Sequence, residues 1–221
     1  MSAQAKLWIA LGTVYTIWGS TYLAIALAVE TIPPLFAVSS RFIAAGALLA
    51  GLVVLRRGAR ALLIGKRELG AVALVGVLFI GANALLFFAE RTVASGLAAL
   101  VFASVPLWVA ALRIAAGDRP PTMVLLGIAV GFVGVAVLLR PGGDVHSWGV
   151  LVALAAALSW SVGSFLSPRL PLPRDALTAT AYEMCVGGLV FLPFGLAARP
   201  IPRASRRAPC SAGHTSSRSA P

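Results

Sequence analysis

Long apolar stretches alternate with short charged or proline-rich breaks along the chain as far as residue 197. Each stretch has 18 to 23 residues, enough for a helix to cross the roughly 30 Å hydrocarbon core of a bilayer. Apolar residues are continuous and do not alternate with polar ones, which predicts helices and not barrel strands. The stretches are residues 7–29, 35–55, 69–89, 94–112, 122–139, 148–167 and 177–197. The sequence therefore predicts an all-α membrane protein with seven transmembrane helices joined by short links.

The residue composition is that of a protein made mostly of membrane-spanning segments. About 130 of the 221 residues are hydrophobic and 25 are charged. The charged share of 11% is far below the roughly 25% of soluble domains, which excludes a soluble globular fold. The net charge of +11 lies between apolar stretches and not on one solvated face, so it does not indicate nucleic-acid binding. Two cysteines, Cys185 and Cys210, are too few for a disulfide framework or a metal cluster.

Lys and Arg residues are distributed unequally between the two ends of the predicted bundle. Up to residue 197, loops on one side carry ten of them and loops on the other side carry two. Cytoplasmic loops usually hold the excess, so the N-terminus is expected in the cytoplasm. Stretch 7–29 also resembles a cleaved signal peptide, with Ala26-Leu27-Ala28 at the cleavage site. Because it is longer than the roughly 7 to 15 apolar residues of such signals, we favour a retained transmembrane helix.

The last segment, residues 198–221, differs from the rest of the chain. It has no apolar stretch and contains five arginines, four prolines and five serines, a composition typical of disorder. Its arginines would lie on the side of the membrane that is otherwise poor in positive charge. One interpretation is a natural basic tail that contacts anionic lipid headgroups. The interpretation that we favour is a damaged reading frame after about Ala198. In that case the tail is not an evolved segment of the protein.

Three residue pairs with one common offset in sequence number indicate an internal repeat. The offset is 142, and the pairs are Trp18 with Trp160, Arg41 with Glu183, and Gly46 with Gly188. It spans five predicted helices, an odd number, so the second copy enters the membrane from the opposite side. Transporters with inverted repeats bind their solute near the membrane midplane and expose it to either side in turn. The repeat therefore predicts an alternating-access transporter.

The order of several short motifs resembles that of EamA-type proteins of the drug/metabolite transporter superfamily. The motifs are Trp18-Gly19-Ser20-Thr21-Tyr22, Pro33-Pro34, Arg41-Phe42, Ala44-Ala45-Gly46, Glu90-Arg91, Ser95-Gly96, Ser104-Val105-Pro106, Ser159-Trp160 and Glu183. The resemblance covers residues 7–197. It implies two inverted repeats of five helices that carry small metabolites or drugs, often outward, across the cytoplasmic (inner) membrane of a bacterium. By that pattern, residues 7–139 are the first repeat, residues 148–197 are the first two helices of the second, and three helices are missing.

Six residues are candidates for substrate binding: Trp18, Tyr22, Arg41, Asn83, Trp160 and Glu183. Arg41 and Glu183 are the two charged residues inside the predicted spans, where charge is costly and usually functional. The donor fork of Arg41 suits a carboxylate or a phosphate, and snorkelling or binding of helix-end carbonyls is the structural alternative. Glu183 is a candidate proton carrier, or else a hydrogen-bonded structural residue. Each lies about 9 Å inside an opposite membrane face, so no direct salt bridge is expected.

The other polar and aromatic residues of the spans have a structural explanation beside the functional one. Trp18 and Tyr22 share a face of the first helix, for solute contact or for packing against neighbours or lipid. Hydroxyl groups on that helix are expected to bond to helix carbonyls at Thr13, Thr16 and Ser20. Asn83 joins helices or lines the solute pathway. Pro106 is expected to kink the fourth helix.

The sequence lacks the residues that several other functional classes require. Retinal proteins require a lysine in the last helix, whereas Lys6 and Lys66 both lie outside the spans. An intramembrane enzyme needs a catalytic pair or metal ligands, but every aspartate and histidine lies in a predicted loop or in the tail. No nucleotide-binding loop supports an ATP-driven pump. No catalytic residue, metal or cofactor is expected. The expected partners are a small-molecule solute, protons as a candidate coupling ion and the lipid bilayer, without nucleic acid.

Two functions from different classes remain. The first is a secondary transporter or exporter of small metabolites or drugs, which the repeat and the intramembrane charges favour. The second is a truncated, non-transporting membrane protein, which the missing helices and the unusual tail favour. The sequence leaves open the substrate, the coupling ion, the direction of transport and the oligomeric state.

Overall fold

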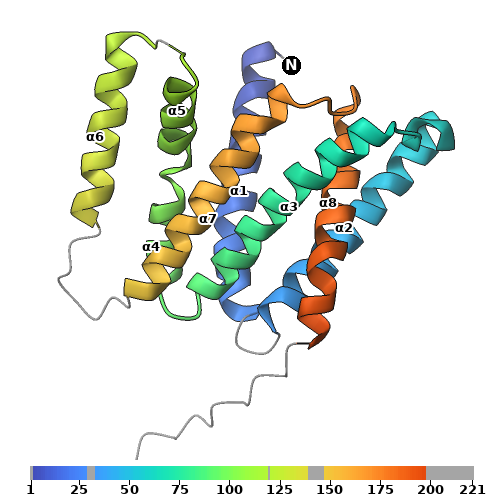
Figure 1. The fold of residues 1–221 in the computed structure, drawn as a ribbon, viewed down its shortest axis with the longest axis horizontal. Coiled ribbons are helices and arrows are strands. Elements are labelled where there is room, and N and C mark those ends of the chain that lie inside the picture. Colours follow the sequence, from blue (N-terminus) through green and yellow to red (C-terminus); the bar gives the residue numbers. More distant parts are fainter. Residues whose placement is uncertain (1, 29–32, 119, 139–146, 198–221) are drawn as a thin grey trace, which may run out of the picture.

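The computed structural model describes residues 2–28, 33–118, 120–138 and 147–197. All regular secondary structure in these residues is helical, which confirms the predicted all-α class (Figure 1). The elements are α1 (Ala3–Ala28), α2 (Pro34–Arg57), η1 (Ala59–Leu62), α3 (Lys66–Ala89), α4 (Ser95–Phe102), α5 (Val105–Ala115), α6 (Thr122–Leu138), α7 (Ser147–Leu166), η2 (Ser167–Arg169) and α8 (Ala176–Ala197). The tail predicted to be disordered, 198–221, lies outside the described residues.

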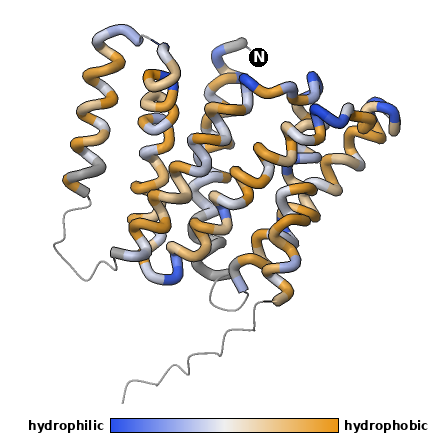
Figure 2. Tube along the Cα trace, viewed as in Figure 1, coloured by the Kyte–Doolittle hydropathy of each residue, from blue (hydrophilic) through white to orange (hydrophobic). Residues whose placement is uncertain are grey.

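Five helical segments in the described residues are long and apolar enough to cross a membrane. They are Leu35–Arg57, Lys66–Ala89, Ser95–Ala115, Trp148–Arg169 and Ala176–Ala197. Helix α6 supplies a shorter apolar stretch, Thr122–Gly134, and α1 covers the first predicted span as far as residue 28. Figure 2 shows hydrophobic residues along the helices and hydrophilic residues at several of the connections. The protein is therefore a multi-pass membrane protein, with a helix at each of the seven predicted positions.

The fourth predicted span is divided into two helices. Helix α4 ends at Phe102 and α5 begins at Val105, with Pro106 in its first turn. Proline has no N–H group and its ring clashes with the preceding turn, so a helix does not continue regularly through it. The buried hydroxyl of Ser104 lies in the gap, where it donates to a carbonyl of α4 at 2.6 Å and accepts from Trp108 Nε1 at 3.1 Å. The irregularity expected at Pro106 is thus a two-residue turn, Ala103 and Ser104, that interrupts the helix just before it.

Helices α2 and α8 pack against each other most extensively, and α3 lies against both α7 and α8. Glycine makes these approaches close. A Cβ atom added to Gly76 of α3 would clash with the backbone of Glu183, and one added to Gly163 of α7 would lie 2.8 Å from the ring of Phe79. Small residues are the usual means of close helix packing in lipid, where no hydrophobic force draws helices together. Helix α6 lies at the edge of the bundle against α5 (Figure 1).

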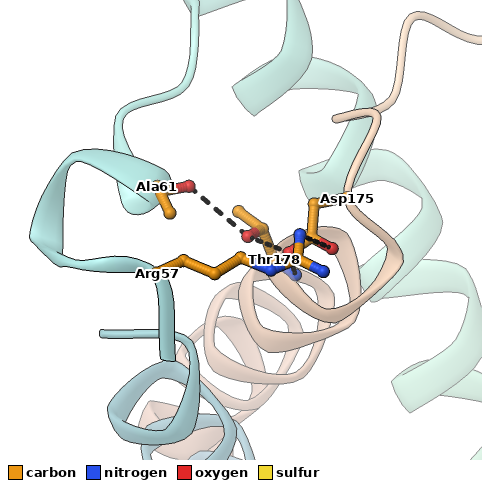
Figure 3. Close-up of polar contacts among 4 residues, drawn as sticks. All are labelled: Arg57, Ala61, Asp175 and Thr178. Carbon is orange, nitrogen blue, oxygen red and sulfur yellow. Dashed lines mark hydrogen bonds and ion pairs between the residues drawn. The ribbon is translucent and has the colours of Figure 1, made fainter. Parts of the chain in front are cut away.

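Polar contacts join the start of α8 to the connection between α2 and α3 (Figure 3). Arg57 forms an ion pair with Asp175. The hydroxyl of Thr178 lies 2.8 Å from Asp175 Oδ2 and 3.4 Å from the carbonyl of Ala61, within reach of both acceptors. The hydrogen bond from Thr178 lowers the pKa of Asp175 below its ordinary value, and the positive charge of Arg57 adds to that effect. These contacts fix the α7–α8 connection to the end of α2.

Helix α8 also contacts the main chain of the 3₁₀ turn η1. The hydroxyl of Tyr182 donates to the carbonyl of Leu62 at 2.7 Å. The chain turns out of α2 at Gly58, whose φ of 82° is a left-handed conformation that other residues rarely adopt. We refer to the contacts between this connection and α8 as the latch, formed by Arg57, Ala61, Leu62, Asp175, Thr178 and Tyr182.

Candidate functional site

A cavity of about 410 Å³ lies between α1, α2, α3, α4, α7 and α8. Four of the six candidate binding residues line it, each from a different helix: Trp18, Arg41, Asn83 and Trp160. The other lining residues are Ile17, Thr21, Phe42, Ala45, Leu86, Phe102 and Met184. Glu183 is not among the lining residues, and the side chain of Tyr22 lies outside the described part of the chain.

Trp160 is the centre of an aromatic cluster on one side of the cavity. Its ring centroid lies 5.7 Å from that of Trp18 and 5.7 Å from that of Phe102, both in edge-to-face geometry. Phe79 packs behind it at 4.6 Å with a tilt of 35°. Edge-to-face pairs bring the positive edge of one ring to the negative face of another, which favours this arrangement. The cluster joins α1, α3, α4 and α7 at the cavity wall.

Arg41 and Asn83 form the polar side of the cavity. The Nη2 group of Arg41 donates to Asn83 Oδ1 at 3.2 Å. Asn83 donates in turn through Nδ2 to the carbonyl of Phe79 at 2.9 Å, one turn earlier in α3. The guanidinium carbon of Arg41 also lies 4.7 Å from the centre of the Phe42 ring and 5.5 Å from that of Phe87. Asn83 therefore joins α2 to α3 and lines the cavity, so that both of its predicted roles are compatible with its position.

The hydroxyl groups of α1 are satisfied within the helix, as the sequence predicted. They donate to carbonyls three or four residues earlier, at 2.8 to 2.9 Å, from Thr13, Thr16, Ser20 and Thr21. Such bonds are the common structural use of Ser and Thr in a helix. Thr21, which lines the cavity, can therefore accept a hydrogen bond from a solute while its own proton stays in the helix.

Glu183 lies in the middle of α8, half-buried, beside the cavity-lining Met184. Its main chain packs against Gly76 of α3. Within the described residues its side chain makes no hydrogen bond and no ion pair, and it does not contact Arg41 as a salt bridge. The expected separation of the two intramembrane charges is therefore consistent with the structure, whereas the structure does not bring Glu183 into the cavity with the other candidates.

Three aromatic or sulfur-containing residues of the cavity wall were not predicted: Phe42, Phe102 and Met184. A signal existed for two of them, since Phe42 and Met184 are related by the same offset of 142 and each directly follows a residue of the Arg41–Glu183 pair. Phe102 had no such signal, because α4 is apolar after Ser95 and shows no polar face that would predict its orientation.

The contacts between α2 and α8 follow the register of the repeat. The two helices begin at Pro34 and Ala176, which are related by the offset of 142. Their glycine contacts are reciprocal: Gly46 lies against Cys185 and Ala181, and Gly188 lies against Ile43 and Ser39. Subtracting 142 from positions 188, 185 and 181 gives 46, 43 and 39, so each contact has a counterpart with the two helices exchanged.

A family model matches nearly the whole described chain. The model is that of the EamA-like transporter family, and it matches residues 6–140 and 147–212. The chain belongs to this family. The resemblance inferred from the short motifs is thus confirmed, and membership of a transporter family agrees with the expectation that the protein is not an enzyme.

Curated relatives are similar over most of this chain. The uncharacterized inner membrane transporter YedA of Escherichia coli K12 is 37% identical over 187 residues, which cover 83% of this chain and 60% of YedA. An uncharacterized transporter of Archaeoglobus fulgidus is 26% identical over 191 residues, covering 86% and 67% of the two chains. Protein PecM of Dickeya dadantii is 28% identical over 201 residues, covering 84% and 62%. The chain thus spans about 60% of the length of its YedA relatives. No solved structure matches the chain.

Proposed function

We propose that the protein carries a small metabolite or drug across the membrane as a secondary transporter, with the solute bound in the cavity around Trp18 and Trp160. The observation that carries the proposal is the composition of the cavity wall. Two pairs of lining residues, Trp18 with Trp160 and Phe42 with Met184, are related by the repeat offset of 142. Inverted-repeat transporters hold their solute at such an interface between matching parts of the two repeats.

The proposed repeats are residues 7–139, with five helices, and residues 148–197, with the first two helices of a second copy. The reciprocal contacts of α2 with α8 support this division, because a two-fold relation pairs every contact with its exchanged counterpart. Trp18 and Trp160, which are counterparts of each other at the offset of 142, are also in contact. Alternating access would then be a rocking of the two repeats about this region.

The proposed orientation has the N-terminus and the latch in the cytoplasm and the protein in the inner membrane of a bacterium. The excess of Lys and Arg in the loops on that side supports the orientation. The description of YedA as an inner membrane transporter supports the choice of membrane. In this orientation the latch joins the two proposed repeats at the cytoplasmic end of α2 and α8.

Glu183 is the proposed proton carrier, and Tyr22 stays a candidate for solute contact. An intramembrane carboxyl without a partner among the described residues is a typical proton site of a secondary transporter. Because Glu183 does not line the cavity, coupling would act through movement of α8, whose next residue, Met184, does line it. Glu183→Gln is expected to remove the dependence of transport on a pH gradient and to preserve solute binding. Unchanged proton dependence in this variant would rule out the role.

Proteoliposomes that contain the purified chain and an isotope-labelled bacterial metabolite extract test the transport proposal. Release is followed by mass spectrometry, and at least one metabolite is expected to leave faster than from protein-free vesicles. Trp160→Ala is expected to slow that release about tenfold, because the solute loses its aromatic wall. Trp148→Ala is the matched control, since Trp148 lies in the same helix, is 72% exposed and does not line the cavity.

The second candidate, a non-transporting membrane protein, is the other outcome of this experiment. Release no faster than from protein-free vesicles, from a monodisperse and folded preparation, would favour it over transport.

A further inference from the structure

The positive charge of Arg41 is not neutralised within the described part of the chain. Its contacts there are a hydrogen bond to Asn83 Oδ1 and the rings of Phe42 and Phe87, and none of these groups is charged. The ion pairs of the described residues involve other arginines. Arginine keeps its proton in proteins, so this cavity holds one full positive charge. Charged side chains within the membrane usually face a water-filled cavity or a charge partner, so a solute anion in this cavity would be attracted by Arg41.

Asn83 sets the position of the guanidinium group and leaves most of its donors available. The amide nitrogen of Asn83 is bonded to the carbonyl of Phe79 at 2.9 Å, so its oxygen is directed towards Arg41. Asn83 takes up one N–H group of the Arg41 fork, at Nη2. The planar fork of an arginine can bind both oxygens of a carboxylate at once, which gives orientation as well as affinity. Arg41 thus lines the cavity with most of its donors available to an anion.

The rest of the cavity is suited to a flat apolar group. Trp18, Trp160 and Phe102 supply aromatic surface, and the other lining residues apart from Thr21 are apolar. The volume of about 410 Å³ equals that of about 14 water molecules at roughly 30 Å³ each. A solute of about ten heavy atoms fits within this space with its polar end on Arg41.

We propose that the solute is a monoanionic carboxylate with a flat, apolar body, held by Arg41 at one end and by Trp18 and Trp160 along its body. This inference rests on the proposed transport site and adds the chemical class of its solute. One guanidinium group balances one negative charge, so a phosphate dianion would leave a second charge unbalanced in the cavity. Aromatic walls alone also attract organic cations, but Arg41 repels them.

Isothermal titration calorimetry with four probes of similar size tests the proposal on the purified chain in detergent. Phenylacetate carries the proposed features, phenylacetamide is its neutral counterpart, cyclohexylacetate keeps the charge without the flat ring, and phenyltrimethylammonium is an aromatic cation. Phenylacetate is expected to bind at least about tenfold more tightly than each of the other three, because it alone meets both Arg41 and the aromatic wall. Phenyl phosphate, added as a fifth probe, is expected to bind more weakly than phenylacetate.

Two variants assign the preference to Arg41. Arg41→Gln is expected to lower the affinity for phenylacetate at least about tenfold and to leave that for phenylacetamide unchanged. Arg41→Lys keeps the charge without the fork and is expected to give an intermediate affinity. Arg56→Gln is the matched control, because Arg56 lies in the same helix outside the cavity. This substitution should leave the affinity for phenylacetate unchanged.

The outcomes separate this inference from the proposed function. Phenylacetate binding that depends on Arg41, together with vesicles that release no metabolite, would support the solute class and reject transport. Release of a neutral or cationic metabolite would support transport and overturn the solute class. Three other results would also overturn the solute class. They are equal binding of phenylacetate and phenylacetamide, equal losses of phenylacetate affinity in Arg41→Gln and Arg56→Gln, and no binding of any probe. If Arg41→Gln does not give a folded protein, the affinities of the unchanged chain for phenylacetate and phenylacetamide still test the solute class.

Discussion

The close approach of α2 to α8 can be tested with a single methyl group at Gly46. Alanine there would place its Cβ atom 2.6 Å from Cys185 Sγ, 2.9 Å from Cys185 N and 3.0 Å from the carbonyl oxygen of Ala181. The sulfur can rotate away, but the nitrogen and the oxygen belong to the backbone of α8 and move only with the helix. Gly46→Ala therefore forces α8 away from α2 by a few tenths of an ångström.

The expected loss of stability follows from two opposing terms. Inserting a methyl group into a packed interface costs about 1 to 3 kcal/mol, and the better helix propensity of alanine returns up to about 1 kcal/mol. The two ranges give a net loss between about 0 and 3 kcal/mol, with a central value of about 1.5 kcal/mol, or a fall of about 3 to 6 °C in the unfolding midpoint for a chain of this size. Gly51→Ala is the matched control in the same helix, because its added Cβ atom has no described neighbour within 4 Å.

The assay is heating of the purified, fluorescently tagged protein in detergent, followed by size-exclusion chromatography of what stays folded. Gly46→Ala is expected to lower the midpoint, whereas Gly51→Ala should leave it unchanged or raise it slightly. Adding Cys185→Ala to Gly46→Ala should restore part of the loss, since the sulfur contact is removed but the contact with Cys185 N remains. Equal midpoints for the two glycine variants would refute the close packing of α2 on α8.

Titratable and buried polar groups at other places give three more expectations. The lowered pKa of Asp175 means that its part of the stability is present at neutral pH and is lost as the pH falls below the ordinary carboxyl range, so Asp175→Asn should remove this acid dependence of the unfolding midpoint. Glu90, at the end of α3, is 8% exposed, and burial raises its pKa to about 7. The protein should therefore lose stability as the pH rises from about 4.5 to about 7, and a slope unchanged in Glu90→Gln would contradict this assignment. The buried hydroxyl of Ser161 lies 2.6 Å from the carbonyl of Ala157, one turn earlier in α7, and 3.2 Å from the carbonyl of Val105 in α5. Ser161→Ala should therefore cost about 0.5 to 1.5 kcal/mol in the same assay, and no loss would show that these contacts do not stabilise the fold.

The positions of the helices could be predicted because the bilayer sets their length and composition. Each apolar stretch of the sequence corresponds to a helix, and the proline at position 106 marked the break in the fourth span. The orientation of each helix about its own axis was harder to predict. Successive residues differ by about 100° around a helix, so that Met184 lines the cavity whereas its neighbour Glu183 does not. The repeat register identified the correct turn of α8 but not the face of it that meets the cavity.

The cavity residues Trp18, Arg41, Asn83 and Trp160 could be predicted because polar and large aromatic side chains are conspicuous in apolar helices. Their partners could not. The contact of Arg41 with Asn83 joins two different helices, and the ion pair of Arg57 with Asp175 joins the end of α2 to the connection between α7 and α8. Both depend on how α2 meets α3 and α8, which the pattern of any single helix does not specify.

The latch has a consequence for which sequence changes the connection between α2 and α3 can accept. Helix α8 contacts this connection at two carbonyl oxygens: Tyr182 donates to that of Leu62 at 2.7 Å, and the Thr178 hydroxyl lies 3.4 Å from that of Ala61. A carbonyl is present whatever the side chain. Substitutions at these two positions therefore keep both acceptors, whereas an insertion or deletion between residues 58 and 65 would move them out of reach of Thr178 and Tyr182. Among relatives that keep the latch, the length of this connection should vary far less than its residues.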